Sequence, residues 1–171
     1  MNKILKYTCL CFLIFIIQSC QNDSKSSEND TIQKAREDSL KLKLNISAYE
    51  KVELNTKADS LINKWPVYED FKNEVNRLKT YTIQDVISNM PTLEKTVDSL
   101  QKTIPKEVDT FPVTSRINVL YTKAKFLRLL SEKQKPRLNH IKTIVEEYPS
   151  ELNALNIQLN EVFIELPEFE N

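Results

Sequence analysis

The chain contains no glycine in 171 residues. At the usual frequency of about 7%, a chain of this length would carry roughly a dozen. Because glycine is the residue that most easily adopts positive φ, its absence disfavours tight hairpins and densely turned barrels. Enzymes that build a phosphate-binding loop or a nucleophile turn from glycine, as in GxGxxG, P-loop and GxSxG motifs, are excluded. The length suits one domain, and long helices joined by proline and polar residues remain.

Apolar residues recur every three or four positions over four stretches, which is the spacing of a buried helix face. The stretches are residues 58–78, 83–104, 117–130 and 138–166. Residues 32–52 have a helical composition, but their apolar spacing slips. We therefore predict an all-α antiparallel bundle of about five helices, some kinked by proline, as a single domain over residues 31–171.

Local signals predict three helix starts. Thr82 with Asp85 resembles a capping box, and Pro136 is placed to be the first residue of the last helix. Thr114 or Ser115 is expected to cap the helix over residues 117–130. Residues 105–113 would then form the long connection between the two halves.

Pro66, Pro91 and Pro149 fall inside the apolar stretches. A proline in a helix removes one backbone hydrogen bond and clashes with the preceding turn, at a cost of about 3 kcal/mol. Because the apolar spacing continues in phase past all three, kinked but continuous helices are expected. Clean breaks at Trp65 and Met90 are the alternative.

The same spacing is also that of a long coiled coil. However, Asn139, Thr143, Asn153 and Asn156 flank the last apolar stretch, where a dimeric coiled coil favours Glu/Lys pairs. A compact bundle is therefore expected. The sequence does not indicate an oligomeric state.

Residues 1–19 have the pattern of a signal peptide. Lys3 and Lys6 precede an uncharged apolar run over residues 8–17, which is too short to cross a roughly 30 Å hydrocarbon core. The sequence Ile17-Gln18-Ser19-Cys20 resembles the lipobox of bacterial lipoproteins. This resemblance implies cleavage before Cys20 and acylation of its thiol and of the new amine. An ordinary secretory signal that happens to end in cysteine, or an uncleaved anchor, is the alternative.

Cleavage would leave a lipidated tether, residues 20–30, which is polar and is predicted to be disordered. Its acyl chains, at roughly 0.8 kcal/mol per buried CH₂, would hold the protein to a membrane. Loss of Lys3 and Lys6 leaves 22 basic against 24 acidic side chains. That balance gives no electrostatic reason to bind nucleic acid.

Residues 105–130, with the following long helix and an upstream Trp-Pro element, resemble small uncharacterised Bacteroidetes lipoproteins. The resemblance implies a helical fold and an envelope address, but no activity. Gln21, where enteric lipoproteins retained in the inner membrane carry Asp, points to the outer membrane. A periplasm-facing protein is expected, and surface exposure stays open because Asn22 and Asp23 are a weak form of the Bacteroidetes export signal.

Asp30-Thr31-Ile32 resembles the Asp-Ser/Thr-aliphatic acceptor of Bacteroidetes O-glycosylation. Thr31 lies beside the predicted tether and is therefore the candidate glycosylation site. The alternative is that polar residues before a buried aliphatic position produce the same triplet.

The inventory of chemically active groups is small. His140 is the only histidine and lies off the apolar face, so it is expected to be solvated. The acid pairs Glu69-Asp70 and Glu146-Glu147 point about 100° apart on a helix and do not converge on a substrate or a calcium ion. No catalytic residue, cofactor or metal site is expected.

Aromatic residues are expected mainly in the core, and the alternative is that they line a ligand cleft. The core candidates are Trp65, Phe71, Tyr121 and Phe126. Phe111, in the predicted connection, either plugs the bundle or contacts a partner.

Charge is unevenly distributed over the last two stretches. Residues 116–142 carry eight basic side chains and one acid, whereas residues 143–171 carry seven acids and no base. In an antiparallel hairpin, Glu146 and Glu147 would lie opposite Lys123 and Lys125. Glu151 would approach Arg116.

The hairpin would turn near Lys135, and its tip would hold Lys133, Lys135 and Arg137 with only Glu132 nearby. Positive charge at a helix start is unfavourable to the helix dipole, so stability does not explain this cluster. The tip is therefore a candidate contact for an acidic partner or for lipid headgroups.

These features favour a non-enzymatic envelope protein that binds an unknown envelope protein or serves as an accessory subunit. The alternative is a carrier or sensor of a small apolar or anionic ligand. A carrier should enclose an apolar pocket of roughly 300–1,000 Å³, whereas an interaction module should have a filled core and an exposed patch.

Overall fold

The computed structural model describes residues 23–46 and 50–164. The signal peptide and Cys20 lie outside these residues. The chain divides into two units, residues 1–39 and residues 40–171. Helix α2 (Asp23–Leu40) is the described part of the first unit and ends at the boundary.

The N-terminal expectations need correction. Residues 23–30, predicted to be disordered, are helical in α2. The segment contains no proline or glycine to interrupt backbone hydrogen bonding. Ile32, an apolar residue of this helix, is 60% exposed. The helix predicted over residues 32–52 ends at Leu40, and the described residues that follow it up to Asn55 form no helix.

The second unit is an all-α bundle, as predicted, with six α-helices among its described residues rather than five. They are α3 (Thr56–Ile62), α4 (Pro66–Arg77), α5 (Ile83–Lys102), α6 (Phe111–Ser131), α7 (Leu138–Glu146) and α8 (Tyr148–Glu161). Two short 3₁₀ turns, η2 (Leu78–Thr80) and η3 (Lys106–Val108), lie in the connections around α5.

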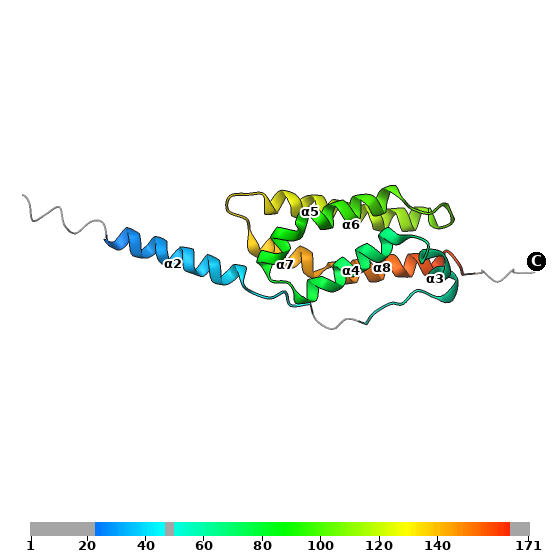
Figure 1. Ribbon diagram of the computed structural model, residues 1–171, viewed down its shortest axis with the longest axis horizontal. Helices are drawn as coiled ribbons and strands as arrows, with labels where there is room; N and C mark the ends of the chain where they lie inside the picture. Colours follow the sequence, from blue (N-terminus) through cyan, green and yellow to red (C-terminus); the bar gives the residue numbers. More distant parts are fainter. Residues whose placement is uncertain (1–22, 47–49, 165–171) are drawn as a thin grey trace, which may run out of the picture. The chain divides into compact units, whose positions relative to one another are not determined.

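Helices α5 and α6 lie side by side and antiparallel, with the most extensive contact in the bundle (Figure 1). Gln101 donates to Asn118 at 2.8 Å, and Lys125 donates to Glu94 at 2.6 Å. The end of α5 therefore meets the start of α6. This arrangement confirms a compact bundle.

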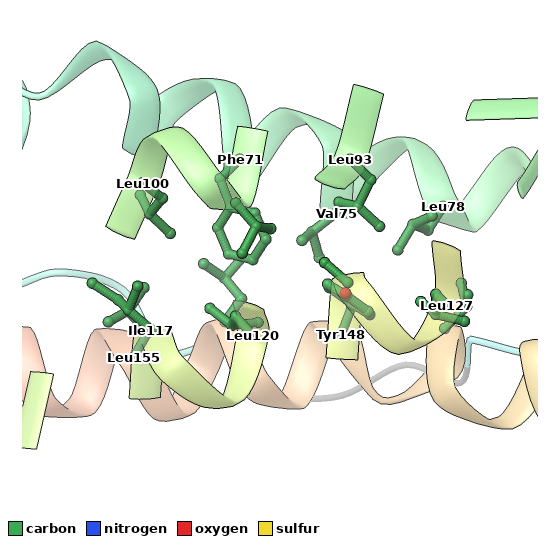
Figure 2. Packing of buried hydrophobic residues seen from close by; sticks show 14 of the residues in the cluster. Phe71, Val75, Leu78, Leu93, Leu100, Ile117, Leu120, Leu127, Tyr148 and Leu155 are labelled. Atoms are coloured by element: carbon green, nitrogen blue, oxygen red, sulfur yellow. The ribbon is translucent and has the colours of Figure 1, made fainter. Parts of the chain in front are cut away.

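The core is filled by the predicted apolar faces. Figure 2 shows side chains of α4, α5, α6 and α8 converging on one another. The ring centroids of Phe71 and Tyr148 lie 6.4 Å apart. The helix faces predicted from the sequence account for nearly all of the buried residues. Burial of apolar surface contributes roughly 25 cal/mol per Å², so this core is the main source of stability.

The three prolines behave differently. Pro91 lies inside α5, which continues through it as predicted. The prediction of continuous helices was wrong for Pro66, which is the first residue of α4 after Trp65, and for Pro149, which is the second residue of α8. A proline in the first turn removes no intrahelical hydrogen bond, so a helix that begins at Pro66 or just before Pro149 loses less stability than a helix kinked at that proline.

Two of the three predicted helix starts were wrong. The Thr82–Asp85 capping box is present. In contrast, α7 begins at Leu138, beyond Pro136, and α6 begins at Phe111 with Thr110 as its N-cap rather than Thr114 or Ser115. Pro112 fits the first turn of α6 because a proline there removes no intrahelical hydrogen bond. Since α6 begins at Phe111, the connection between α5 and α6 ends earlier than the predicted residue 113.

An extended strap, residues 50–55, lies against α8. Asn153 accepts a hydrogen bond from the backbone N–H of Val52 at 3.0 Å. Its amide nitrogen donates to the carbonyl of Glu50 at 2.6 Å. One side chain thus satisfies two backbone groups of the strap, which lacks a neighbouring strand.

The pattern repeats two turns further along α8. Asn160 accepts from the backbone N–H of Asn55 at 2.7 Å and donates to the carbonyl of Glu53 at 2.9 Å. Between these two residues, Asn156 donates to the carbonyl of Val52 at 2.7 Å. The asparagines of α8 therefore bind the strap through its backbone.

Candidate interaction surface

The basic tip lies where the sequence predicted it, in the connection between α6 and α7. Lys133, Lys135 and Arg137 are exposed, and none of the three forms an ion pair with a described residue. Glu132, the nearest acid, instead accepts from Arg128 at 2.6 Å. The tip therefore presents three cations that no described acid neutralises by a direct contact.

Phe111 is the first residue of α6 and is 87% exposed. It does not plug the bundle, which leaves a partner contact as the remaining sequence-based reading. Beside it lies a small hollow of about 220 Å³, lined by Thr110, Pro112, Gln158, Glu161 and Val162.

A second apolar line runs along α6 on the side away from the core. Four exposed residues belong to it: Phe111, Val119 (37%), Phe126 (47%) and Leu129 (57%). Ser115 and Thr122 continue the same three- and four-residue spacing, which places all six on one helix face. We call these six residues the outer stripe.

The outer stripe joins the two candidates proposed from sequence. It begins at Phe111 and ends at Leu129, four residues before Lys133 in the tip. The two contact regions are therefore ends of one surface along α6. The three- and four-residue spacing of the outer stripe is present in the sequence, but the sequence prediction used only the apolar face of α6 that supplies the core.

Phe126 in this stripe corrects the expectation that it packs in the core. Trp65 and Phe71 are buried, as predicted, and Tyr121 is half-buried. Lys125 Nζ lies 5.2 Å from the centre of the Tyr121 ring, which suits a cation–π contact.

The predicted charge pairing across the bundle is present in part, because Lys123 lies opposite Glu147, and is wrong for Lys125 and Glu151. Lys123 donates to Glu147 at 2.6 Å and also to Glu151. Burial alone would lower the pKa of Lys123, but its hydrogen bonds to Glu147 and Glu151 outweigh burial and raise it. Lys125 forms an ion pair with Glu94 on α5 instead.

The prediction for Arg116 was also wrong. Glu151 is held by Lys123, and Arg116 is exposed and makes no ion pair within the described part of the chain. Arg116 lies next to the outer stripe, so it adds a fourth positive charge that no described acid pairs with.

A groove of about 610 Å³ lies between α4 and α5. Its lining includes Asp70, Glu74, Arg77 and Lys95, and Arg77 already pairs with Glu74 at 2.5 Å. The groove is open and its acids balance its bases. It does not have the enclosed apolar character expected of a carrier.

The acid pairs do not converge. Glu147 binds Lys123, whereas Glu146 accepts from the backbone N–H of Asn45 at 2.5 Å. Within residues 23–46 and 50–164, no three histidine, cysteine or carboxylate side chains lie close enough to hold a metal ion. His140 is exposed, as predicted.

Thr31 is exposed on α2, whereas Cys20 lies outside the described residues. Among those residues, no helix is both long enough and apolar enough to cross a bilayer. The chain matches no family model, no curated protein and no solved structure.

Proposed function

We propose that this protein is an envelope lipoprotein, anchored through Cys20 to the outer membrane and facing the periplasm. Its helical bundle binds another envelope protein and carries out no catalysis. The lipobox pattern over residues 17–20 supports the anchor.

One observation carries the proposal of binding: an exposed apolar line on α6 leads directly into three unpaired cations. Isolated exposed apolar residues are ordinary on a protein surface, whereas four on one face of one helix, with Phe126 and Leu129 one turn apart, favour an interaction site. The filled core and the open, charge-balanced groove between α4 and α5 favour this function over the carrier or sensor.

The test reverses the charge of the tip with Lys133→Glu, Lys135→Glu and Arg137→Glu together. The control makes the same charge change at Lys41, Lys64 and Lys106, which are also exposed. Partners are then trapped by chemical crosslinking in intact producing cells and identified by mass spectrometry.

The tip variant should retain the parent's melting temperature, because the tip makes no ion pair, and it should lose the adduct in a salt-sensitive way. The control should retain the adduct. Equal capture by all three proteins at low salt would rule out the tip as a contact.

A further inference from the structure

We propose that the outer stripe of α6 binds an acidic amphipathic helix of the partner protein, lying lengthwise along α6. The inference rests on the proposed function, because it names the chemistry of the protein partner invoked there. It is carried by the spacing of the stripe, its narrow width and the charges beside it.

The dimensions of the stripe match those of another helix. At 100° and 1.5 Å per residue, its six positions fall within an arc of about 80° and extend over about 27 Å. From Ser115 to Leu129 the spacing alternates between four and three residues, and Phe111 lies a further four residues before Ser115. Such a narrow stripe is typical of the seam of paired helices, whereas a helix that packs broadly has an apolar arc of at least about 100°. A membrane surface would also favour a wider apolar face.

Thr122, one of the two polar members of the stripe, does not oppose this contact. The Thr122 hydroxyl donates to the carbonyl of Asn118 within α6 at 2.9 Å. Its donor is therefore already satisfied, and covering Thr122 with an apolar side chain leaves no unpaired N–H or O–H.

The charges of α6 determine the sign of the partner. The helix contains four basic residues and no acid. Arg116 flanks one side of the stripe and Lys125 the other, and Lys133 follows its end. Lys123, on the same side as Arg116, is already held by Glu147 and Glu151. In paired helices, residues at these flanking positions form the salt bridges that select the partner.

A second copy of this chain is a poor occupant, because pairing α6 with α6 would place bases opposite bases. A helix with aspartate or glutamate beside its apolar seam would instead meet Arg116 at one end and the tip at the other. Lys125, already bound to Glu94, is still half-exposed and can be shared.

The probe is a synthetic three-heptad peptide with leucine at its seam and glutamate at the flanking positions. It is titrated against the full chain in detergent micelles. Phe126→Asp or Leu129→Asp should weaken binding at least tenfold. Ile157→Asp on α8 is the matched control, because Ile157 is 41% exposed and lies outside the stripe, and it should leave binding unchanged.

A second peptide with lysine at the flanking positions should bind at least tenfold more weakly than the acidic one. Vesicles of phosphatidylglycerol and phosphatidylethanolamine test the membrane alternative. The proposal is overturned if the acidic peptide does not bind, if the stripe variants bind it like the parent, or if the vesicles bind through Phe126 and Leu129 while the peptide does not.

A photo-crosslinking residue placed in cells at position 126 or position 135 separates this proposal from the proposed function. An adduct at 126 with an acidic helical segment supports both. Protein adducts at 135 alone would overturn the stripe proposal and leave the proposed function standing. No protein adduct at either position would overturn both.

Discussion

The hydroxyl of Tyr68 on α4 donates a hydrogen bond of 2.6 Å to the side-chain oxygen of Asn156 on α8, and both residues are buried. The amide nitrogen of Asn156 continues to the carbonyl of Val52 in the strap. One asparagine therefore joins two helices and the strap. Burial raises the pKa of Tyr68, so the phenol stays protonated and remains a donor at neutral pH.

Asn156→Ala should destabilise the fold because it leaves the Tyr68 hydroxyl and the Val52 carbonyl without partners. An unsatisfied buried polar group costs about 1–3 kcal/mol, and denaturant unfolding would measure the loss. Asn160→Ala is the control at the exposed edge of the strap, where water replaces the lost bonds, and its effect should be smaller. If the two variants have the same free energy of unfolding, the buried hydrogen bonds of Asn156 contribute no more to stability than the exposed ones of Asn160.

Leu152→Ala or Leu155→Ala should each lower the free energy of unfolding by about 2–5 kcal/mol, through lost burial and a residual cavity. Both leucines are almost completely buried. Thermal melting with Ile157→Ala as the exposed control on the same helix checks the claim. Parent-like melting of both leucine variants would contradict the packing of α8.

Cys20→Ala should abolish lipid modification and release the protein from the membrane fraction. Metabolic labelling with a radioactive fatty acid measures the first effect, and fractionation measures the second. The control is Ser19→Ala, which keeps a small residue before the cysteine. Label that persists on the Cys20 variant would eliminate the lipobox assignment.

Acid should weaken the start of α5. Hydrogen bonds from Thr82 lower the pKa of Asp85 below its ordinary 3.8. A lowered pKa in the folded state adds stability above pH 3.8, and this contribution disappears as the pH falls through the folded-state value. NMR titration of the Asp85 carboxyl should show its pKa rising toward 3.8 in Thr82→Ala, and acid unfolding of that variant should depend less on pH. An unchanged titration would show that the side chain of Thr82 does not hold the carboxylate.

Apolar spacing was sufficient to predict the bundle and its core. Met90 and Val97 lie on the same buried face of α5 on either side of Pro91, because the helix keeps its phase through the proline. Helix ends were harder to predict. Pro66, Pro149 and Pro91 all lie within apolar spacing that continues in phase past them. The spacing therefore does not distinguish a proline that begins a helix from one that lies within a helix.

The candidate surface was predicted at its two ends and missed in the middle. Phe111 and Lys133 could each be selected from the sequence around them. The exposure of Val119 depends on which helices cover α6, and the spacing of apolar residues does not reveal which helices these are. The charge pairing was predicted only in part for a similar reason. Lys123 binds Glu147, but Lys125, which was also placed opposite Glu146 and Glu147, binds Glu94 because α5 lies on its side of α6.

The strap could not be predicted from its own sequence, because α8 holds it through its backbone groups, which every residue carries. Asparagines beside an apolar helix face were correctly interpreted as disfavouring a dimeric coiled coil. Their actual role, binding residues 50–55, requires contacts more than one hundred residues apart in the chain.

No described residue has a positive φ, so every chain reversal among them uses conformations open to any ordinary amino acid. This has a consequence for the unfolded chain as well as for the fold. Replacing glycine by alanine where the backbone permits it stabilises a protein by about 0.4–1 kcal/mol, because the denatured chain has fewer conformations to lose. A chain built without glycine gains that advantage throughout, and its loops should accept substitutions that would be fatal to a turn dependent on one special residue.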